Sequence, residues 1–307
     1  MSKRKRQEIR RFFVGLLLII AIYAYKTYLE EPVNEILYKL EEQEIIPVQT
    51  RKVDGNLKVY FVDVGQGDCI LIQNKTHNMV IDAGNNEDGA KLVTYFKSLG
   101  VQKIDYLVGT HAHEDHIGGM DDIIRNFEVK TFYMPEVITT TKTFEDVLDA
   151  LEEKQIPFDT PEIDKEFSLG DASIETLYVG KDESDLNNTS IVLKLTYGSN
   201  AFLFTGDAES KVEKQILNKD ISADILKLGH HGSSSSTSKD FLKEVNPTYA
   251  IASCEKKNSY GHPHKETLKK LKNQNVKLYR TDRDGTIIAI SDGNKISIVT
   301  KETDTNG

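Results

Sequence analysis

Apolar positions along most of the chain recur in two patterns, short continuous runs and runs with a helical period. The short runs, such as those at 57–64, 69–73 and 104–110, predict strands. Apolar residues at helical spacing, as in 89–99, predict helices with one buried face. Further strands are expected at 78–81, 129–134, 174–179, 191–195, 201–204, 224–228, 249–253, 286–290 and 295–299, and further helices at 120–126, 143–155, 209–218, 239–245 and 265–273.

Strands and helices alternate through the first half of this pattern, which predicts an α/β fold whose sheets are covered by helices. The chain has 307 residues, of which 38% are hydrophobic, and this is enough for one well-buried domain. We expect that domain at 56–300, followed by a polar tail at 301–307. The two cysteines, Cys69 and Cys254, lie in or directly after apolar runs and are expected to be small buried residues rather than a disulfide.

The N-terminus has a different pattern from the rest of the chain. Residues 1–11 hold six positive side chains against one negative, and residues 12–25 then carry no charge. Because the side chain of Lys26 can extend toward the membrane surface, we expect a transmembrane signal anchor at 12–29. The basic arm at 1–11 is expected to stay in the cytoplasm, so everything after the anchor would lie outside the plasma membrane.

Two alternatives to an anchor are weaker. A cleaved signal peptide needs small residues at set positions before the cut, and no suitable pair follows the apolar run. A buried soluble helix would need a polar face, which this run lacks. Residues 30–55 are rich in Glu and Lys and contain Pro32 and Pro47, so we expect a short, partly helical stalk there.

Net charge limits the classes of partner. The chain carries −9 and its basic arm +5, so the remaining residues carry −14. A domain this acidic has no general electrostatic attraction for nucleic acid. Bound metal ions would nevertheless make a site locally positive, and such a site attracts a phosphate.

The residues with the clearest chemistry lie in one loop after the predicted strand at 104–110. His111 and His113 are two apart in an extended segment, so both imidazoles can face one metal ion. Asp115 and His116 follow where a helix is expected to begin, and the change of chain direction lets them bind a second ion. Three imidazoles and one carboxylate suit zinc, manganese or iron better than calcium or magnesium. Four candidate ligands so close together make a plain hydrogen-bonded loop the weaker alternative.

The segment at 111–116, with the sequence His-Ala-His-Glu-Asp-His, matches the HxHxDH signature of the metallo-β-lactamase superfamily. The chain resembles that superfamily over about 56–300. The turns Asp-Val-Gly-Gln-Gly-Asp at 63–68 and Ile-Asp-Ala-Gly at 81–84 also look like the opening hairpins of that family. The resemblance implies a four-layer αβ/βα sandwich of two mixed sheets, and a hydrolase that uses two metal ions.

The resemblance implies roles for residues far from the histidine loop. Asp207 follows the predicted strand at 201–204 in a Gly-Asp turn and matches the family's bridging aspartate, whose carboxylate binds both ions. Gly206 would let the backbone approach closely there. Asp82 matches the aspartate that orients a ligand imidazole. Asp68 is expected close to the site.

Two adjacent histidines, His230 and His231, compete for the last position on the second ion. The sequence does not separate them, and the other histidine would contact substrate or stabilise the leaving group. Serines follow at 233–236, but a serine nucleophile is not expected because the metal ions already supply a nucleophile.

The chain departs from many members of the superfamily at 185–190, where they carry a third histidine for the first metal and this chain has asparagines. Its Asn-Asn-x-Ser sequence, and Tyr-Gly-His-Pro-His at 260–264, resemble the C-terminal domain of bacterial DNA-uptake (competence) channel proteins. Asn188 is therefore a candidate contact for substrate or water, with a plain polar turn as the alternative. His262, just before a helix, is a candidate to bind an anionic oxygen or to act as general acid.

Together these residues predict a metallohydrolase with two divalent ions, zinc or manganese. The ligand set shared by the two ions is His111, His113, Asp115, His116, Asp207 and His230 or His231. A water held between two ions becomes hydroxide near neutral pH and attacks in line. Asp115, His230 and His262 are the residues expected to take part in catalysis. Gly118 and Gly119 are expected to leave room over the site.

The predicted substrate is a phosphodiester outside the membrane. A nuclease or phosphodiesterase follows from the resemblance to the DNA-uptake domain. A cell-wall phosphodiester, or a small ester of the phosphocholine type, is the alternative that the acidic charge favours. A non-catalytic, membrane-anchored scaffold is a third possibility, and the complete ligand set argues against it.

Overall fold

The computed structural model describes residues 56–301 except residue 183. The basic arm, the anchor and the stalk predicted above lie outside the described residues, as does the polar tail beyond residue 301. Within the part of the chain that is described, no helix combines the length and the apolar character needed to cross a bilayer.

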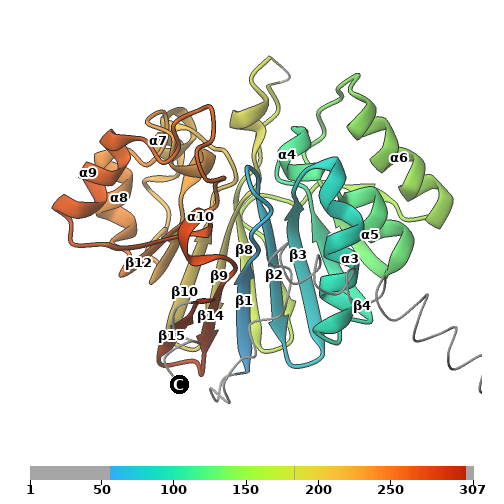
Figure 1. Ribbon diagram of the computed structural model, residues 1–307, viewed down its shortest axis with the longest axis horizontal. Helices are drawn as coiled ribbons and strands as arrows, with labels where there is room; N and C mark the ends of the chain where they lie inside the picture. Colours follow the sequence, from blue (N-terminus) through green and yellow to red (C-terminus); the bar gives the residue numbers. More distant parts are fainter. Residues whose placement is uncertain (1–55, 183, 302–307) are drawn as a thin grey trace, which may run out of the picture. The chain divides into compact units, whose positions relative to one another are not determined.

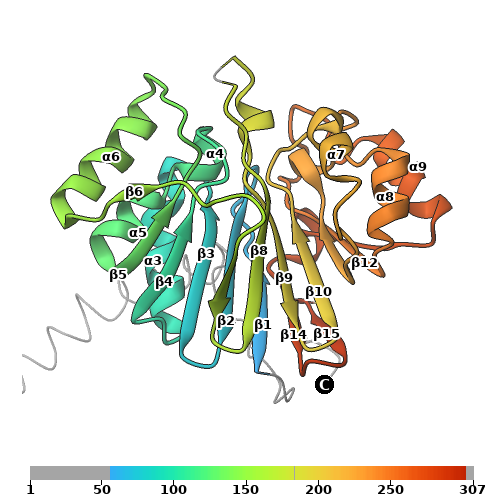
Figure 2. The same ribbon diagram turned by 180° about the vertical axis from the view of Figure 1, so that it is seen from behind.

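Two mixed sheets form the centre of the fold (Figure 1, and from behind in Figure 2). From edge to edge, the eight-stranded sheet contains β15 (Ile296–Val299), β14 (Ile287–Ser291), β1 (Leu57–Phe61), β2 (Cys69–Asn74), β3 (His77–Ala83), β4 (Lys103–Val108), β5 (Glu128–Tyr133) and β6 (Phe158–Asp159). The seven-stranded sheet contains β13 (Lys277–Arg280), β12 (Tyr249–Ala252), β11 (Ile225–Lys227), β10 (Asn200–Phe204), β9 (Val192–Tyr197), β8 (Ala172–Tyr178) and β7 (Glu166–Leu169). Pairing is parallel from β3 to β6 and from β10 to β13, and antiparallel elsewhere.

Helices cover the outer face of each sheet, and both views show this arrangement (Figure 1). The eight-stranded sheet carries α3 (Gly89–Ser98), α5 (Met120–Asn126) and α6 (Lys142–Lys154), and the short α4 (Glu114–Ile117) lies at its end. The seven-stranded sheet carries α7 (Ser210–Ile216), α8 (Lys239–Val245) and α9 (Lys265–Asn273), and α10 (Thr281–Asp284) follows β13. Three short 3₁₀ turns are η1 (Asn86–Asp88), η2 (Leu186–Thr189) and η3 (Gly229–Gly232). The predicted four-layer sandwich is confirmed.

The main core lies between the two sheets. Phe61 and Ile72 face it from the first sheet, and Leu195 and Phe204 face it from the second; all four are buried. The rings of Phe61 and Phe204 are 6.3 Å apart across the interface. A second core fills the space between the seven-stranded sheet and its helices. Because many strands are thus buried on both faces, their sequences are continuous apolar runs rather than alternating ones.

The predicted elements and the observed ones agree within a few residues, with exceptions at the sheet edges. β13 was not predicted, because its sequence Lys-Leu-Tyr-Arg carries a charge at each end. β6 and β7 also lie at sheet edges and were not predicted, because each contains a charged residue and exposed or partly exposed positions instead of an apolar run. Cys69 and Cys254 are both buried and free, as expected.

Four segments that follow strands meet between the two sheets at their carboxyl ends. Backbone hydrogen bonds join them: Ile191 N donates to Thr110 O at 3.0 Å, and His230 N donates to Gly206 O at 3.2 Å. The carboxyl end of parallel strands is where α/β sheets ordinarily bind ligands. The fold therefore brings the predicted site residues to one edge of the sandwich.

Candidate metal centre

The histidine loop leaves the carboxyl end of β4 and turns its side chains toward the second sheet. His111 Nε2 lies 3.0 Å from His113 Nδ1, so one ion can reach both nitrogens. His113 is extended, with φ −91° and ψ 150°, and α4 begins at the next residue. The turn into α4 brings Asp115 Oδ2 to within 3.1 Å of His231 Nε2, which comes from the loop after β11.

Asp82, at the end of β3, holds the histidine loop from behind. Its Oδ1 accepts a hydrogen bond from Thr110 N, and its Oδ2 lies at hydrogen-bond distance from Thr110 Oγ1 and His116 Nδ1, each at 2.8 Å. Its backbone has a φ of +60°, which is uncommon for an aspartate and which these bonds help to maintain. With Nδ1 of His116 bound in this way, Nε2 is left to face the site. These are the contacts expected of an aspartate that orients a ligand imidazole.

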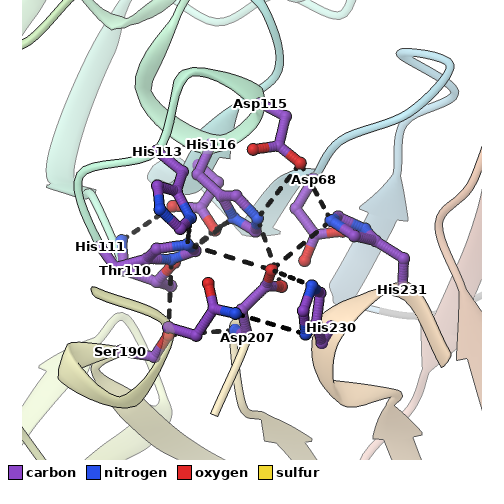
Figure 3. A network of polar contacts seen from close by, with 12 residues as sticks. Asp68, Thr110, His111, His113, Asp115, His116, Ser190, Asp207, His230 and His231 are labelled. Atoms are coloured by element: carbon purple, nitrogen blue, oxygen red, sulfur yellow. Dashed lines mark hydrogen bonds and ion pairs between the residues drawn. The ribbon is translucent and has the colours of Figure 1, made fainter. Parts of the chain in front are cut away.

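Asp207 lies at the centre of the cluster and faces imidazoles from both sheets (Figure 3). Its Oδ1 is 3.3 Å from His116 Nε2. Its Oδ2 is 4.0 Å from His111 Nε2 and 3.7 Å from His231 Nε2. Its backbone N–H donates to Ser190 Oγ at 3.0 Å, which ties the residue to the end of η2. A carboxylate in this place could bind a metal ion together with imidazoles on either side of it.

Gly206 makes the position of Asp207 possible. Gly206 has a φ of +50°, and a Cβ there would lie 2.9 Å from Ser190 Oγ and from Thr110 Cβ. Any side chain would push the two loops apart. The close backbone approach expected from the sequence is therefore present.

Ligand atoms of four residues lie close together between the sheets: Asp115 Oδ2, His116 Nε2, His231 Nε2 and both carboxylate oxygens of Asp207. The neighbouring pairs are 3.1 Å (Asp115 to His231), 3.3 Å (His116 to Asp207), 3.7 Å (His231 to Asp207) and 3.9 Å (His116 to Asp115). Nitrogen and oxygen ligands held about 2.0–2.1 Å from a tetrahedral zinc ion are roughly 3.3 Å apart. The spacing fits a divalent ion without rearrangement of the backbone.

Two buried atoms at this point have no hydrogen-bond partner, His116 Nε2 and Asp207 Oδ1. They lie 3.3 Å from each other, but not in hydrogen-bonding geometry. A buried polar atom without a partner costs about 1–3 kcal/mol, and one metal ion would satisfy both atoms. The donor set and its unpartnered atoms therefore fit a centre for divalent ions.

His231 is fixed on the side that faces away from the cluster. Its Nδ1 lies 3.1 Å from Ser253 O and 3.3 Å from Asp68 Oδ1. Asp68 in turn forms an ion pair with Lys227 at 2.7 Å, and the side chains of both are at most 2% exposed. Asp68, predicted to be close to the site, thus stands directly behind a candidate ligand. This geometry favours His231 as the metal-binding member of the histidine pair.

His230 is held less firmly than its neighbour. Its side chain is 25% exposed, against 1% for His231. Its Nδ1 has only long contacts, 3.4 Å to Glu209 Oε1 and 3.4 Å to Asn187 Nδ2. Its Nε2 is 3.7 Å from Asp207 Oδ2. His230 therefore faces the open side of the cluster.

Opposite charges alternate through the cluster and shift its pKa values. Burial would raise the pKa of Asp115, but the neighbouring His116 and His231 hold it at about 2. Burial would lower the pKa of His231, but Asp207 and Asp68 raise it to about 9. A bound cation would replace the protons that the imidazoles carry, so metal binding releases protons.

A cleft of about 320 Å³ opens over the cluster. Its lining consists mainly of carboxylates and imidazoles, with one tyrosine at the rim. The residues that line it are Gln66, His113, Glu114, Asp115, Asn187, Asp207, His230, His231, Tyr260 and His262.

Asn187 and Asn188 point in different directions. Asn188 is buried, its Nδ2 donates to Asp185 Oδ2, and its Oδ1 accepts from Glu209 N. Both ends of its amide are therefore used inside the protein. Asn187 lines the cleft, and its Oδ1 has no hydrogen-bond partner. The structure gives Asn188 a supporting place and makes Asn187 the amide that a substrate or water would meet.

His262 lines the cleft and is 7% exposed. Its backbone N–H donates to Asn258 Oδ1 at 2.9 Å, and its ring Nδ1 has no partner. Burial and the charges of His231 and His230 lower its pKa to about 4, so the ring is neutral near pH 7. A neutral imidazole with an unpartnered nitrogen is suited to hydrogen-bond an anionic oxygen.

Gly118 and Gly119 do not open space over the cleft, and that expectation is wrong. A Cβ on Gly118 would lie 2.3 Å from the carbonyl carbon of Asn85, and one on Gly119 would lie 2.6 Å from Ala83 O. The two glycines instead let the start of α5 pack against the end of β3. They serve the support behind the histidine loop, not the cleft.

The sequence profile of the Metallo-beta-lactamase superfamily matches residues 62–255, which is more than half of the chain. The chain belongs to this superfamily. Metallo-β-lactamase proteins are generally metal-dependent hydrolases and usually bind two divalent ions, and the clusters of ligand atoms described above agree with that.

This metallo-β-lactamase chain is similar to part of two larger proteins. It is 30% identical over 251 residues to ComE operon protein 3 of Bacillus subtilis, which covers 75% of this chain and 32% of that protein. It is 30% identical over 231 residues to Competence protein ComA of Neisseria gonorrhoeae, which covers 73% and 31%. The chain thus spans about a third of the length of these relatives. The resemblance to competence proteins is confirmed.

A solved structure supports the metallo-β-lactamase fold independently of sequence. The fold matches that of YhfI from Bacillus subtilis with a TM-score of 0.52, at 14% identity, over 79% of this chain and 100% of YhfI. At this identity the match speaks to the fold alone.

Three residues at or behind the cleft were not singled out from the sequence. Lys227 is a charge inside the apolar run Ile-Leu-Lys-Leu, and a charge in a buried strand signals a buried partner. Asn187 precedes the asparagine that was chosen, and nothing in the sequence separates the two. Tyr260 stands in the segment that was noted for its histidines.

Proposed function

We propose that this chain is a metal-dependent phosphodiesterase that is anchored in the plasma membrane by residues 12–29, with its hydrolase domain outside the cell. The main observation behind the proposal is that imidazoles and carboxylates from both sheets converge around His116 Nε2 and Asp207 Oδ1, two buried atoms without a hydrogen-bond partner. Zinc and manganese are the ions that such a mixed donor set suits.

The proposed ligands form two groups that share one carboxylate. They are His111 and His113 for the first ion, Asp115, His116 and His231 for the second, and Asp207 for both. When bound, two divalent ions lower the pKa of a water molecule and offset the charge on phosphate oxygens.

Other residues of the chain prepare the cleft for an anionic substrate. Asp82 and Asp68 fix His116 and His231 from behind, so that a ring nitrogen of each faces the site. His262 lines the cleft and has an unpartnered Nδ1, and it is proposed to hydrogen-bond a phosphate oxygen. His230 is proposed to contact the substrate, because it faces the cleft and lacks a firm partner behind it.

Nucleic acid is the substrate class that we propose. One relative is a competence protein by name, and another, from Haemophilus influenzae, is Recombination protein 2; these names support DNA as the polymer. Since the chain has a net charge of −9, attraction for a polyanion has to come from the site itself and its surroundings.

Metal analysis together with turnover tests the proposal. The purified full-length chain should hold about two equivalents of zinc or manganese and hydrolyse bis(p-nitrophenyl) phosphate and single-stranded DNA. The variants His113→Ala and Asp207→Asn should lower turnover by at least about a hundredfold, because each removes a proposed ligand. The matched control is Ile138→Ala, a side chain that is 76% exposed and away from the cleft.

Two outcomes would refute the enzyme. Full turnover after exhaustive chelation would show that the reaction does not need a metal ion. If the chain binds two ions but hydrolyses no phosphodiester, the non-catalytic scaffold is the remaining alternative. Location has a separate test, because protease added to intact cells should cut an exported domain and spare a cytoplasmic control protein.

A further inference from the structure

Tyr260 is an exposed aromatic side chain at the rim of the cleft. Among the described residues, the large hydrophobic side chains that are strongly exposed are Ile138, Leu148, Ile163 and Tyr260. Of these four, Tyr260 is the one that lines the cleft, and its side chain is 64% exposed. A single exposed aromatic side chain needs no explanation by itself, but this one lines the same cleft as the candidate metal ligands, where a bound substrate would meet it.

The ring of Tyr260 has one supported face. It stacks on the imidazole of His262, with centroids 5.6 Å apart and an interplanar angle of 17°. The surrounding backbone is fixed by side chains: Asn258 Nδ2 donates to His262 O at 2.8 Å, and His264 Nε2 lies 3.0 Å from Tyr260 O. The ring is therefore a flat surface held in place beside the metal centre.

The segment that carries Tyr260 is basic within an acidic chain. Residues 255–280 contain eight Lys or Arg and two Glu, a net charge of +6, whereas the whole chain carries −9. Lys256 and Lys257 are exposed in the same loop as Tyr260. Lys265, the first residue of α9, is also exposed. Within the described part of the chain, these three lysines form no ion pair. They are available to the phosphates of a polyanion.

We propose that Tyr260 is a stacking platform for a base of single-stranded nucleic acid whose neighbouring phosphodiester lies at the metal centre, and that the lysines of 256–272 follow the strand away from the cleft. This inference rests on the proposed phosphodiesterase function and adds the residue that would bind a base at that site. Stacking of a base on an aromatic side chain contributes on the order of a ten- to a hundredfold in affinity and tolerates any sequence.

The chemistry of other phosphodiester polymers fits this rim less well. The bases of a double helix are stacked on one another and present no free face to a ring. A wall polymer of sugar alcohols and phosphates would meet the lysines but has no planar group for Tyr260. The pairing of a flat ring with unpaired lysines is typical of proteins that bind single strands.

A comparison of two oligomers tests the inference. The full-length chain is assayed on a single-stranded oligothymidine and on the same oligomer with abasic sugars, for the wild type, Tyr260→Phe and Tyr260→Leu, with Ile138→Ala as control. The wild type, Ile138→Ala and Tyr260→Phe should prefer the base-bearing oligomer by about ten- to a hundredfold in kcat/KM. In Tyr260→Leu this preference should fall to near one.

Binding is followed separately from turnover by the fluorescence of 2-aminopurine in the oligomer, which a stacked ring quenches. Quenching by the wild type and Tyr260→Phe, and its loss in Tyr260→Leu, supports the platform even if neither oligomer is cleaved; in that case the phosphodiesterase proposal alone fails. An unchanged preference in Tyr260→Leu, or no quenching by the wild type, overturns the platform. Equal or faster cleavage of the abasic oligomer by the wild type also overturns it and points to a base-free polymer.

Discussion

The two loops that supply histidines differ in what stands behind their imidazoles. In the loop after β4, Asp82 binds Thr110 and His116 through three contacts of 2.8 Å. In the loop after β11, two adjacent histidines share the same left-handed conformation, with φ of 48° at His230 and 53° at His231. Behind His231 lies Asp68 at 3.3 Å, a buried carboxylate paired with a buried lysine, whereas Glu209, 3.4 Å from His230 Nδ1, is 29% exposed.

This difference teaches how a ligand can be told from a substrate contact when the residue type is the same. A metal-binding imidazole needs its second nitrogen fixed, since this sets the orientation and the proton of the ring. His116 and His231 meet that condition, whereas His230 has contacts of 3.4–3.7 Å and a partly exposed side chain. We therefore expect the partner behind each ring to set its role, and the following changes test that rule.

The largest effect is expected from Lys227→Met. This change leaves the carboxylate of Asp68, which is buried, without its lysine. Loss of one partner of a buried pair costs about 3–5 kcal/mol in the free energy of unfolding. Urea unfolding of the full-length chain measures it.

Lys194→Met is the matched control for Lys227→Met. Lys194 is also buried on a strand, with a side chain that is 8% exposed, but its partner Asp220 is 75% exposed. An exposed carboxylate that loses its lysine is solvated by water, so the cost should be about 1 kcal/mol or less. If the two substitutions lower the free energy of unfolding equally, the buried pair behind His231 contributes no more to stability than the exposed one.

The second effect separates the two histidines of η3. His231→Ala should weaken binding of one of the two ions by more than about a hundredfold, because loss of a ligand exceeds the 10–100-fold seen for residues behind ligands. His230→Ala should change metal affinity by less than about threefold and act on turnover instead. Titration of the metal-depleted chain with zinc, read against a competing chelator, measures both. The reverse order of the two effects would end the rule.

The fold could be predicted from the sequence because so many strands are buried on both faces. A continuous apolar run, such as residues 69–72 of β2, predicts such a strand even though apolar and polar residues do not alternate in it. The edge strands β6, β7 and β13 gave no such signal: β13, for example, holds Lys277 and Arg280, and every residue in it is partly or fully exposed. An edge strand forms because it pairs with one adjacent strand, and the topology of the chain, not the local sequence, decides which strand that is.

The site could be predicted only where its residues are close together in the chain. Four candidate ligands of the histidine loop lie within six residues, so their spacing alone predicted a metal site. His230 and His231 are adjacent, so the sequence around them does not distinguish their roles. The distinguishing contact is that of His231 with Asp68, which comes from the other sheet. The same holds for Lys227, because its partner Asp68 comes from the loop directly before β2, in the other sheet. Contacts between distant segments carry the remaining information.

The third effect tests the support behind the first loop. Asp82→Asn keeps the size of the side chain but replaces one acceptor oxygen by an NH₂ group, so Thr110 or His116 loses its partner. Metal affinity should fall by about 10–100-fold, as it does when residues that orient ligands are changed. Chelator competition measures the affinity, and circular dichroism checks that the variant is folded. Unchanged affinity in a folded variant would show that the ring of His116 needs no partner behind it.

The smallest effect comes from Asp105, a carboxylate on β4 at the end away from the site, and it is the control for Asp82. Asp105 Oδ1 accepts from Lys130 Nζ at 2.6 Å and its Oδ2 from Asn78 N at 3.1 Å. Asp105→Asn should cost about 1 kcal/mol in the free energy of unfolding at pH 7. Metal affinity should stay as in the wild type, because none of these contacts reaches the cluster.

The pH dependence of the Asp105→Asn effect has a definite sign. Burial raises the pKa of Asp105, but Lys130 and the N–H of Asn78 outweigh burial and lower the pKa below its ordinary value. A carboxyl with a lower pKa in the folded state stabilises the fold above its unfolded pKa, about 3.9, and loses this as the pH falls through the folded pKa. The gap between wild type and Asp105→Asn should therefore be present at pH 7 and shrink below about pH 4. Urea midpoints measured across this range decide it, and a gap that widens in acid would mean that Asp105 is held as the neutral acid.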